Sequence, residues 1–140
     1  TQIGITDFTP LLCERSVAKF SIRSVARWQK TCLEACKQSQ RPWVPRLHQP
    51  KLWAEMFNTD GGAGRVVWLA DAGGGYSTAV QKLKADELIL LVGPEGGFSP
   101  SEWKLLSDTD IEPVTLAKTV LRTETAAVAM VSAAITRLGV

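Results

Sequence analysis

The sequence of 140 residues contains no run of eighteen consecutive apolar residues, which excludes a transmembrane helix. Its first residues lack the basic start and apolar stretch of a secretory signal peptide. They also lack an initiator Met, so we expect a fragment of a larger protein. Hydrophobic residues make up 45 % and charged residues 21 %, enough apolar side chains for a core and too few charges for a disordered chain. The length fits a single domain.

Cysteine is scarce, and the three cysteines are an odd number in a chain without an export signal. This count argues against a disulfide framework. Cys32 and Cys36 lie four residues apart, but no further Cys or His pair has the spacing of metal ligands. Because structural zinc needs four ligands, we interpret the cysteines as free thiols and expect no metal. A reducing cytoplasm is the expected location.

Charge is nearly balanced, and the net value of +2 is too small to identify a partner. Its distribution is uneven, because residues 1–64 hold nine Lys or Arg and five Asp or Glu, whereas residues 65–140 hold seven and nine. A mildly basic first half suits a polyanion, and a solvated surface explains the same pattern.

Apolar periodicity predicts the elements of the first half. Residues 8–12 form an apolar run of strand length, and residues 21–38 carry apolar side chains at helical spacing. Three prolines in residues 40–50 predict an extended or irregular segment, and residues 51–57 predict a short helix.

The second half alternates strands with helices. Residues 66–70, 88–92 and 113–116 are the predicted strands, and residues 77–83, 100–107 and 123–138 are the predicted helices. Ser99 and Glu102 form a capping box with Pro100 at the first helical position. Continuous apolar strands indicate burial on both faces, so we predict an α/β fold with a mostly parallel sheet flanked by helices.

Ligands of an open parallel sheet bind beyond the carboxyl ends of its strands, which points to the loops 71–76, 93–98 and 117–122. The middle loop has three glycines in five residues, so its backbone can approach a ligand closely. Its sequence matches neither a Walker A loop nor a dinucleotide-binding motif. Ordinary turns also use such glycines, and that interpretation stays open.

The third loop leads into the last predicted helix. Thr123 is a candidate N-cap, and Arg122 and Glu124 place opposite charges beside it. The helix start favours an ionised Glu124. A capped helix with a surface ion pair is the alternative interpretation.

These two stretches, LVGPEGGFS at residues 91–99 with Glu102 and LRTETAA at residues 121–127, resemble the RsmE family. Its members are 16S rRNA uridine-N3 methyltransferases of the SPOUT superfamily. The upstream matches are Gly4-Ile5-Thr6, Thr9-Pro10-Leu11, Glu14-Arg15-Ser16, Arg27-Trp28, Glu34-Ala35-Cys36 with Gln38, and Val44-Pro45. The likeness therefore spans nearly the whole chain.

The resemblance implies a C-terminal trefoil knot, an exception to the rule that chains do not thread loops. It also implies a homodimer that binds S-adenosyl-L-methionine in the knot and acts on 16S rRNA of the small ribosomal subunit. The cofactor-binding residues that it implies are Leu69, Ala70, Gly93, Pro94, Glu95, Gly96, Gly97, Leu116, Ala117, Thr119, Leu121 and Thr123.

The reaction implied by the resemblance needs alignment of an activated sulfonium methyl with a uridine N3 that loses its proton. Arg122 is the candidate to stabilise the developing imide anion. Glu124 is the candidate to orient Arg122 or to accept the proton, and a relay through water is an equal alternative. His48 lies far from these motifs in the sequence, so we do not expect it to be the base.

RNA contacts are expected from a basic stripe. Arg23, Arg27 and Lys30 share one helical face, and Arg15 precedes them. Trp28, Trp43 and Trp53 are interpreted mainly as core or dimer contacts, with base stacking as the alternative.

The sequence also departs from the family pattern. We expect residues 1–140 to be the methyltransferase domain alone, without the family's N-terminal RNA-binding β-barrel domain and without the leading strand of the methyltransferase domain itself. Ala117 replaces a usual Gly, Thr119 replaces a frequent Arg, and the loop after Ala70 lacks the usual pattern. Two alternatives therefore stay open: a knotted methyltransferase for another RNA target (a ribose 2′-hydroxyl or a tRNA base), and a non-catalytic, cofactor-binding dimerisation module.

Overall fold

A computed structural model describes residues 1–17, 20–56, 64–73, 86–107 and 109–139. Within these residues a three-stranded parallel sheet has β5 (Arg65–Ala70) at its centre, between β6 (Glu87–Leu91) and β7 (Glu112–Val114). The predicted parallel sheet is therefore confirmed. The helix predicted over residues 77–83 lies outside the described residues.

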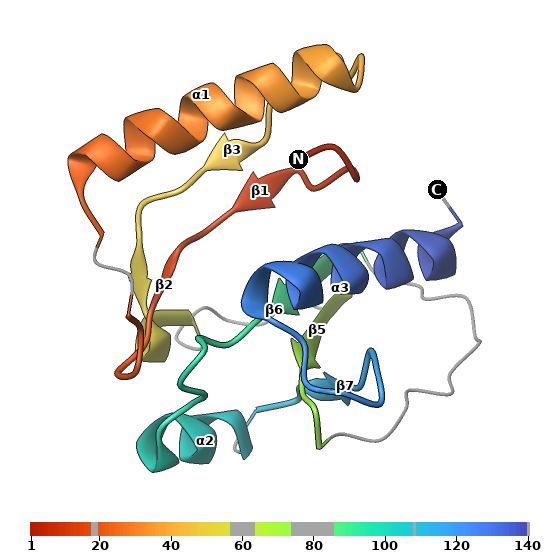
Figure 1. Cartoon of the computed structure of the whole chain (residues 1–140). Helices are drawn as coiled ribbons and strands as arrows, with labels where there is room; N and C mark the ends of the chain where they lie inside the picture. Colours follow the sequence, from red (N-terminus) through yellow and green to blue (C-terminus); the bar gives the residue numbers. More distant parts are fainter. Residues whose placement is uncertain (18–19, 57–63, 74–85, 108, 140) are drawn as a thin grey trace.

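The two faces of this sheet carry separate cores, because neighbouring side chains of a strand point to opposite faces. Trp68 packs with Met130 and Ala134 of α3 (Thr123–Leu138) on one face. Leu69 packs on the other face with Leu106 of α2 (Pro100–Ser107) and with Trp53 of a short 3₁₀ helix, η1 (Trp53–Met56). The predicted flanking of the sheet by helices is thus confirmed, with α3 opposite α2 and η1 (Figure 1).

Burial of the large side chains stabilises this arrangement by roughly 1.5–3 kcal/mol for each fully buried group. Trp68 and Met130 are the largest of the fully buried side chains. The indole nitrogen of Trp68 still donates a hydrogen bond, to Oε2 of Glu112 at 2.9 Å. The guanidinium of Arg137 lies over the same ring, 4.8 Å from its centroid.

The start of α2 is built as the sequence predicts. Oε2 of Glu102 accepts a hydrogen bond from the Ser99 backbone N–H at 2.8 Å, and Oγ of Ser99 accepts from the Glu102 N–H at 3.2 Å. These reciprocal bonds satisfy N–H groups that have no partner within the helix. The predicted capping box and the bounds of α2 are confirmed.

The N-terminal half forms two short parallel pairs, β1 (Asp7–Phe8) with β3 (Arg46–Leu47) and β2 (Leu11–Leu12) with β4 (Lys51–Leu52). The single strand predicted over residues 8–12 is wrong, because Pro10 has no N–H and the chain changes partner there. The short helix predicted over residues 51–57 is confirmed only in part, and Phe57 lies outside the described residues. Its first two residues pair with β2, and only the next four form a 3₁₀ turn.

The longest helix, α1 (Ile22–Gln38), begins after Ser21, whose hydroxyl accepts a hydrogen bond from the Ser24 N–H at 3.2 Å. Trp28 on α1 meets Phe8 of β1 edge to face, with ring centroids 6.2 Å apart. This contact places α1 against the β1–β3 pair, at the opposite end of the molecule from α2 (Figure 1).

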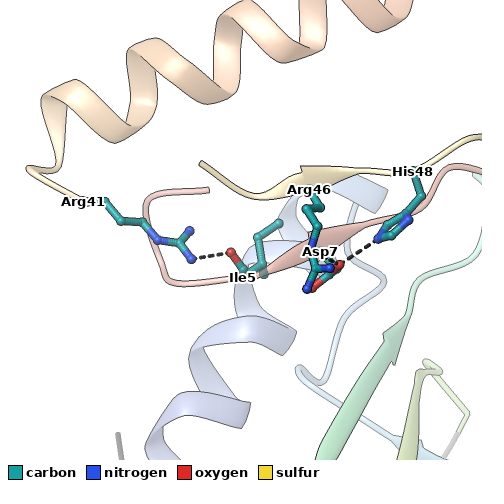
Figure 2. A network of polar contacts seen from close by, with 5 residues as sticks. All are labelled: Ile5, Asp7, Arg41, Arg46 and His48. Carbon is teal, nitrogen blue, oxygen red and sulfur yellow. Dashed lines mark hydrogen bonds and ion pairs between the residues drawn. The ribbon is translucent and has the colours of Figure 1, made fainter. Parts of the chain in front are cut away.

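Polar contacts hold the first eight residues against residues 41–48 (Figure 2). Oδ1 of Asp7 lies 3.3 Å from Nε of Arg46 and 2.7 Å from Nε2 of His48. The Arg41 guanidinium donates to the carbonyls of Thr1, Gly4 and Ile5. His48 therefore lies in an exposed polar cluster on the β1–β3 pair.

Candidate functional site

The loops that follow β5, β6 and β7 meet around a cavity of about 580 Å³ at the carboxyl edge of the sheet. Its walls come from residues 70–72 at the end of β5, from residues 92–95, 97 and 98 after β6, and from residues 116, 117 and 119–123 between β7 and the start of α3. This is the edge at which the strand order predicts a ligand. Of the predicted loop 71–76, only residues 71–73 are described.

Ten of the twelve residues that the resemblance assigns to the cofactor line this cavity. They are Ala70, Gly93, Pro94, Glu95, Gly97, Leu116, Ala117, Thr119, Leu121 and Thr123. Leu69 and Gly96 lie elsewhere: Leu69 is 2 % exposed in the core, and the Gly96 carbonyl accepts a hydrogen bond from Nη1 of Arg15 at 3.3 Å.

The glycines of the middle loop are required by their protein surroundings. Gly97 has a φ of +66°, a left-handed angle that favours glycine, and its N–H donates to the Pro94 carbonyl at 2.9 Å. A Cβ at Gly93 would come within 2.9 Å of the Phe98 ring, and one at Gly96 would come within 3.0 Å of Arg15 Cβ. Tight turns and close packing therefore explain these glycines, and the loop's backbone still forms one wall of the cavity.

Thr123 does not cap α3 as the sequence predicts. The N-cap is Arg122, which makes no side-chain cap bond, and Thr123 is the first residue of the helix. The Thr123 hydroxyl instead donates to the carbonyl of Gly93 at 3.3 Å. The hydroxyl thus bonds to the distant Gly93 carbonyl instead of to an N–H of its own helix, and this bond connects the third loop to the glycine-rich loop.

Two further hydrogen bonds connect the first loop, after β5, to the end of β7. The Asp71 N–H donates to the Val114 carbonyl at 3.1 Å, and the Thr115 hydroxyl donates to the Asp71 carbonyl at 3.0 Å. The three loops are therefore linked to one another through hydrogen bonds near the cavity, besides the strands from which they extend.

Charged groups of both signs line the cavity. Arg15 and Arg122 are positive, and Asp71 and Glu95 are negative. Arg122 and Glu124 are both exposed at the start of α3. Within the described part of the chain no ion pair joins them, so the structure does not have the surface ion pair of the alternative interpretation. Glu124 is not among the lining residues.

Several lining residues are not among those that the resemblance assigns to the cofactor, although four of them lie in the predicted ligand-binding loops: Asp71, Ala72, Phe98 and Val120 in those loops, and Arg15, Val92, Trp103, Val114 and Ala126 outside them. Most of them adjoin predicted residues along the chain. Trp103, which is 43 % exposed, meets the edge of Phe98 at a centroid distance of 5.6 Å. Arg15 lies in a turn that is far away in the sequence from the other lining residues. Its position at the cavity follows from its contact with Gly96, which only the structure shows.

The predicted basic stripe divides into two parts. Arg23, Arg27 and Lys30 are exposed on α1 and do not line the cavity, whereas Arg15 does. Of the three tryptophans considered, Trp53 is buried, Trp28 is partly buried against Phe8, and Trp43 is 59 % exposed. The expectation of a core role is confirmed for Trp53.

Within the described ranges, no three His, Cys, Asp or Glu side chains are grouped so that they could hold a metal ion. No helix in that part of the chain is long and apolar enough to cross a membrane.

Known proteins similar to this chain are RNA methyltransferases. A family model described as "RNA methyltransferase domain" matches residues 1–135. The Ribosomal RNA small subunit methyltransferase E of Synechocystis is 33 % identical over 130 residues, which cover 90 % of this chain and 43 % of that protein.

Two solved structures share the fold. The Ribosomal RNA small subunit methyltransferase E of Neisseria gonorrhoeae, bound to S-adenosyl methionine, matches with a TM-score of 0.84 and 27 % identity, over 96 % of this chain and 56 % of that one. A Legionella pneumophila protein in complex with the cofactor SAM matches with a TM-score of 0.81 and 30 % identity, over 96 % and 57 %.

The chain spans about half the length of the curated relatives it matches, between 43 % and 57 % for the first two. The similarity nevertheless covers almost all of the chain itself, including the loops that line the cavity. The chain belongs to the RNA methyltransferase domain family, in its RsmE group.

Proposed function

We propose that this chain binds S-adenosyl-L-methionine in the cavity and transfers its methyl group to N3 of a uridine in 16S rRNA. One observation carries the proposal: the three loops at the carboxyl edge of the sheet form one cavity, and ten of twelve expected cofactor-binding residues line it. The names of the relatives, and the methyl donor bound in the two solved structures, support it.

The residues of the cavity fit this cofactor. Its volume of about 580 Å³ lies within the range of roughly 300–1,000 Å³ that small-molecule sites occupy. Val92, Leu116 and Leu121 offer apolar surface for a nucleoside ring, and the loop backbone offers hydrogen-bonding groups. Asp71 and Glu95 offer negative charge for a cationic donor.

The cofactor, when bound, supplies a methyl group that its positive sulfur has already activated. The chain's own residues then have two tasks, to orient the uridine and to stabilise the negative charge that N3 gains as it loses its proton. Arg122 is exposed at the cavity and carries the charge needed for the second task. Glu124, in the first turn of α3, would orient Arg122 or accept the proton, directly or through water.

The proposal extends to the RNA and to the assembly. Arg23, Arg27 and Lys30 form an exposed basic face on α1 that suits contacts with rRNA phosphates. Val120, which lines the cavity, and Val128 of α3 are 84 % and 54 % exposed and suit burial in a homodimer. A trefoil knot in the C-terminal half and a cytoplasmic location, where the small ribosomal subunit would be modified, complete the proposal.

Calorimetry with S-adenosylmethionine, followed by nucleoside mass spectrometry of RNA treated with the chain, tests the function. Small ribosomal subunits and naked 16S rRNA are compared as substrates. Formation of 3-methyluridine supports the proposal. Methylation of a ribose hydroxyl or another base would redirect it to another RNA target, binding without transfer would indicate a non-catalytic module, and absence of binding would contradict it.

A further inference from the structure

A turn formed by residues 13–16 packs beside the cavity, although it is about eighty residues away in sequence from the loop it meets. The Ser16 N–H donates to the Cys13 carbonyl at 3.1 Å, and the Cys13 N–H donates to Oγ of Ser16 at 3.2 Å. These two bonds close the turn and place Glu14 and Arg15 at its tip.

Glu102 holds this turn in place. Glu102 is 4 % exposed, and only Oε2 of its carboxylate is used by the helix cap at Ser99. Oε1 accepts a hydrogen bond from the Glu14 N–H at 2.8 Å, 88 residues away in the sequence. A buried charge is costly unless hydrogen bonds satisfy it, so this second bond is a specific link between α2 and the turn.

Neighbouring groups reinforce the link. The Ser101 hydroxyl donates to Oε1 of Glu14 at 2.8 Å. Burial, and then the negative charge of Glu102, raise the pKa of the Cys13 thiol to about 11. The turn is therefore held against the start of α2 through both the backbone and the side chain of Glu14.

The consequence of this link is the position of Arg15. Its Nη1 donates to the Gly96 carbonyl at 3.3 Å, and its side chain lines the cavity beside the Gly93–Gly97 stretch. A guanidinium has five N–H donors in a rigid fork, which matches the oxygens of a carboxylate or a phosphate. The bond to Gly96 uses one of them.

We infer that Arg15 binds an oxyanion of the ligand in the cavity and that Glu102 is the residue that positions it. The inference rests on the proposed function and adds two residues to the site. Two groups have the required chemistry, the α-carboxylate of the methyl donor and a phosphate of the target nucleotide.

The test compares the binding of S-adenosylhomocysteine, 5′-methylthioadenosine and a 16S rRNA fragment to the unmodified chain and to Arg15→Met. The second compound has no amino-acid carboxylate. If Arg15 binds the carboxylate, the variant loses at least about tenfold in affinity for S-adenosylhomocysteine and less than about twofold for 5′-methylthioadenosine. If it binds a phosphate, both small-molecule affinities stay unchanged, RNA affinity falls about tenfold, and the salt slope falls by about one.

Matched variants separate positioning from stability. Glu102→Gln keeps the side-chain size but weakens the hydrogen bond to the turn. It should therefore lower the affinity for the same ligand as Arg15→Met does, but by a smaller factor of about three to five. Ser21→Ala removes the N-cap bond of α1, no residue of which lines the cavity, so it should lower the melting temperature without that effect. Arg46→Met, outside the cavity, controls for the loss of one positive charge.

Unchanged affinity of Arg15→Met for all three ligands would overturn the inference and leave Arg15 as a structural tie to Gly96. Loss of affinity for 5′-methylthioadenosine as large as that for S-adenosylhomocysteine would overturn it too, because the variant would then have deformed the whole cavity. If the unmodified chain binds neither nucleoside, the proposed function itself fails.

Discussion

The hydroxyl of Thr123, at the first position of α3, donates a hydrogen bond to the carbonyl of Gly93 at 3.3 Å. Gly93 lies in the loop after β6, and Thr123 begins the helix that follows the loop after β7. Both residues line the cavity. The bond therefore holds together two walls that are 30 residues apart in the sequence.

Replacing Thr123 with Val keeps the shape of the side chain and removes the donor, so the Gly93 carbonyl loses its partner. We expect a loss of about five- to tenfold in affinity for S-adenosylmethionine, corresponding to roughly 1 kcal/mol for one hydrogen bond. Calorimetry measures this loss. Thr123→Ser keeps the hydroxyl and should bind within about twofold of the unmodified chain, and equal affinities of the two variants would show that the bond is unimportant.

Gly93 and Gly97 are glycine for different reasons, which predicts different responses to alanine. At Gly93 a Cβ would press on the Phe98 ring, which packs against Trp53 at a centroid distance of 4.5 Å. Gly93→Ala should therefore disturb the core and lower the free energy of unfolding by roughly 1–3 kcal/mol in urea titration.

At Gly97 a Cβ would meet nothing within 4 Å, and only the φ of +66° opposes a side chain. Gly97→Ala should cost roughly 1–2 kcal/mol, and Gly97→Asn should recover part of that loss because Asn tolerates this angle. Equal stabilities for the alanine and asparagine variants would contradict the backbone explanation.

Local chemistry explains what the sequence predicts well. Ser99, Pro100 and Glu102 determine the start of α2 through bonds that span three residues. The apolar runs that became β5 and β6 are continuous because helices cover both faces of the sheet. Both signals are contained in a few neighbouring residues, and both predictions are confirmed.

Contacts between distant residues explain what the sequence did not predict. Thr123 has the chemistry of an N-cap, but its hydroxyl bonds to Gly93 instead. The sequence predicts only a helix-capping role for Glu102, but its second carboxylate oxygen accepts a hydrogen bond from a turn 88 residues away. The two-residue strands β2 and β4 exist only through their mutual pairing, so neither has a pattern of its own.

Arg122 lies exposed at the cavity, where a positive charge would stabilise the anion formed at uridine N3. Arg122→Ala should reduce the turnover rate by roughly 10²–10³-fold, because the charge acts on the transition state, and leave affinity for S-adenosylmethionine within about twofold. Single-turnover methylation and calorimetry measure the two effects.

Glu124→Gln is the companion variant, since it tests both roles proposed for that carboxylate. If Glu124 accepts the proton, the variant should lose activity at all pH values and lose the acidic limb of the pH–rate profile. If Glu124 only orients Arg122, the limb should persist at a lower rate. A rate of Arg122→Ala equal to that of the unmodified chain would remove Arg122 from the mechanism, and an unchanged rate of Glu124→Gln would remove Glu124.

Asp7 predicts a pH dependence of stability that is independent of the cavity. The hydrogen bond with His48, with a smaller effect from Arg46, lowers the pKa of the Asp7 carboxyl below its usual value of 3.8. A lowered pKa in the folded state stabilises the fold above the unfolded-state value, and this contribution disappears as the pH falls through the folded-state pKa.

Asp7→Asn should therefore reduce the free energy of unfolding at pH 7 by less than about 1 kcal/mol, because the group is exposed and solvent screens its partners. The difference from the unmodified chain should vanish in strong acid. Urea titrations across the acid range measure it, with Asp110→Asn as a control at an exposed carboxylate that has no ion pair among the described residues. A difference that persists after Asp7 is protonated would contradict this origin.

The most direct test is a crystal structure of the chain grown with S-adenosylhomocysteine. We expect the nucleoside to lie between the Gly93–Gly97 stretch and residues 116–121, on the residues that line the cavity. A nucleoside bound along α1, or at any other surface away from these two loops, would contradict it.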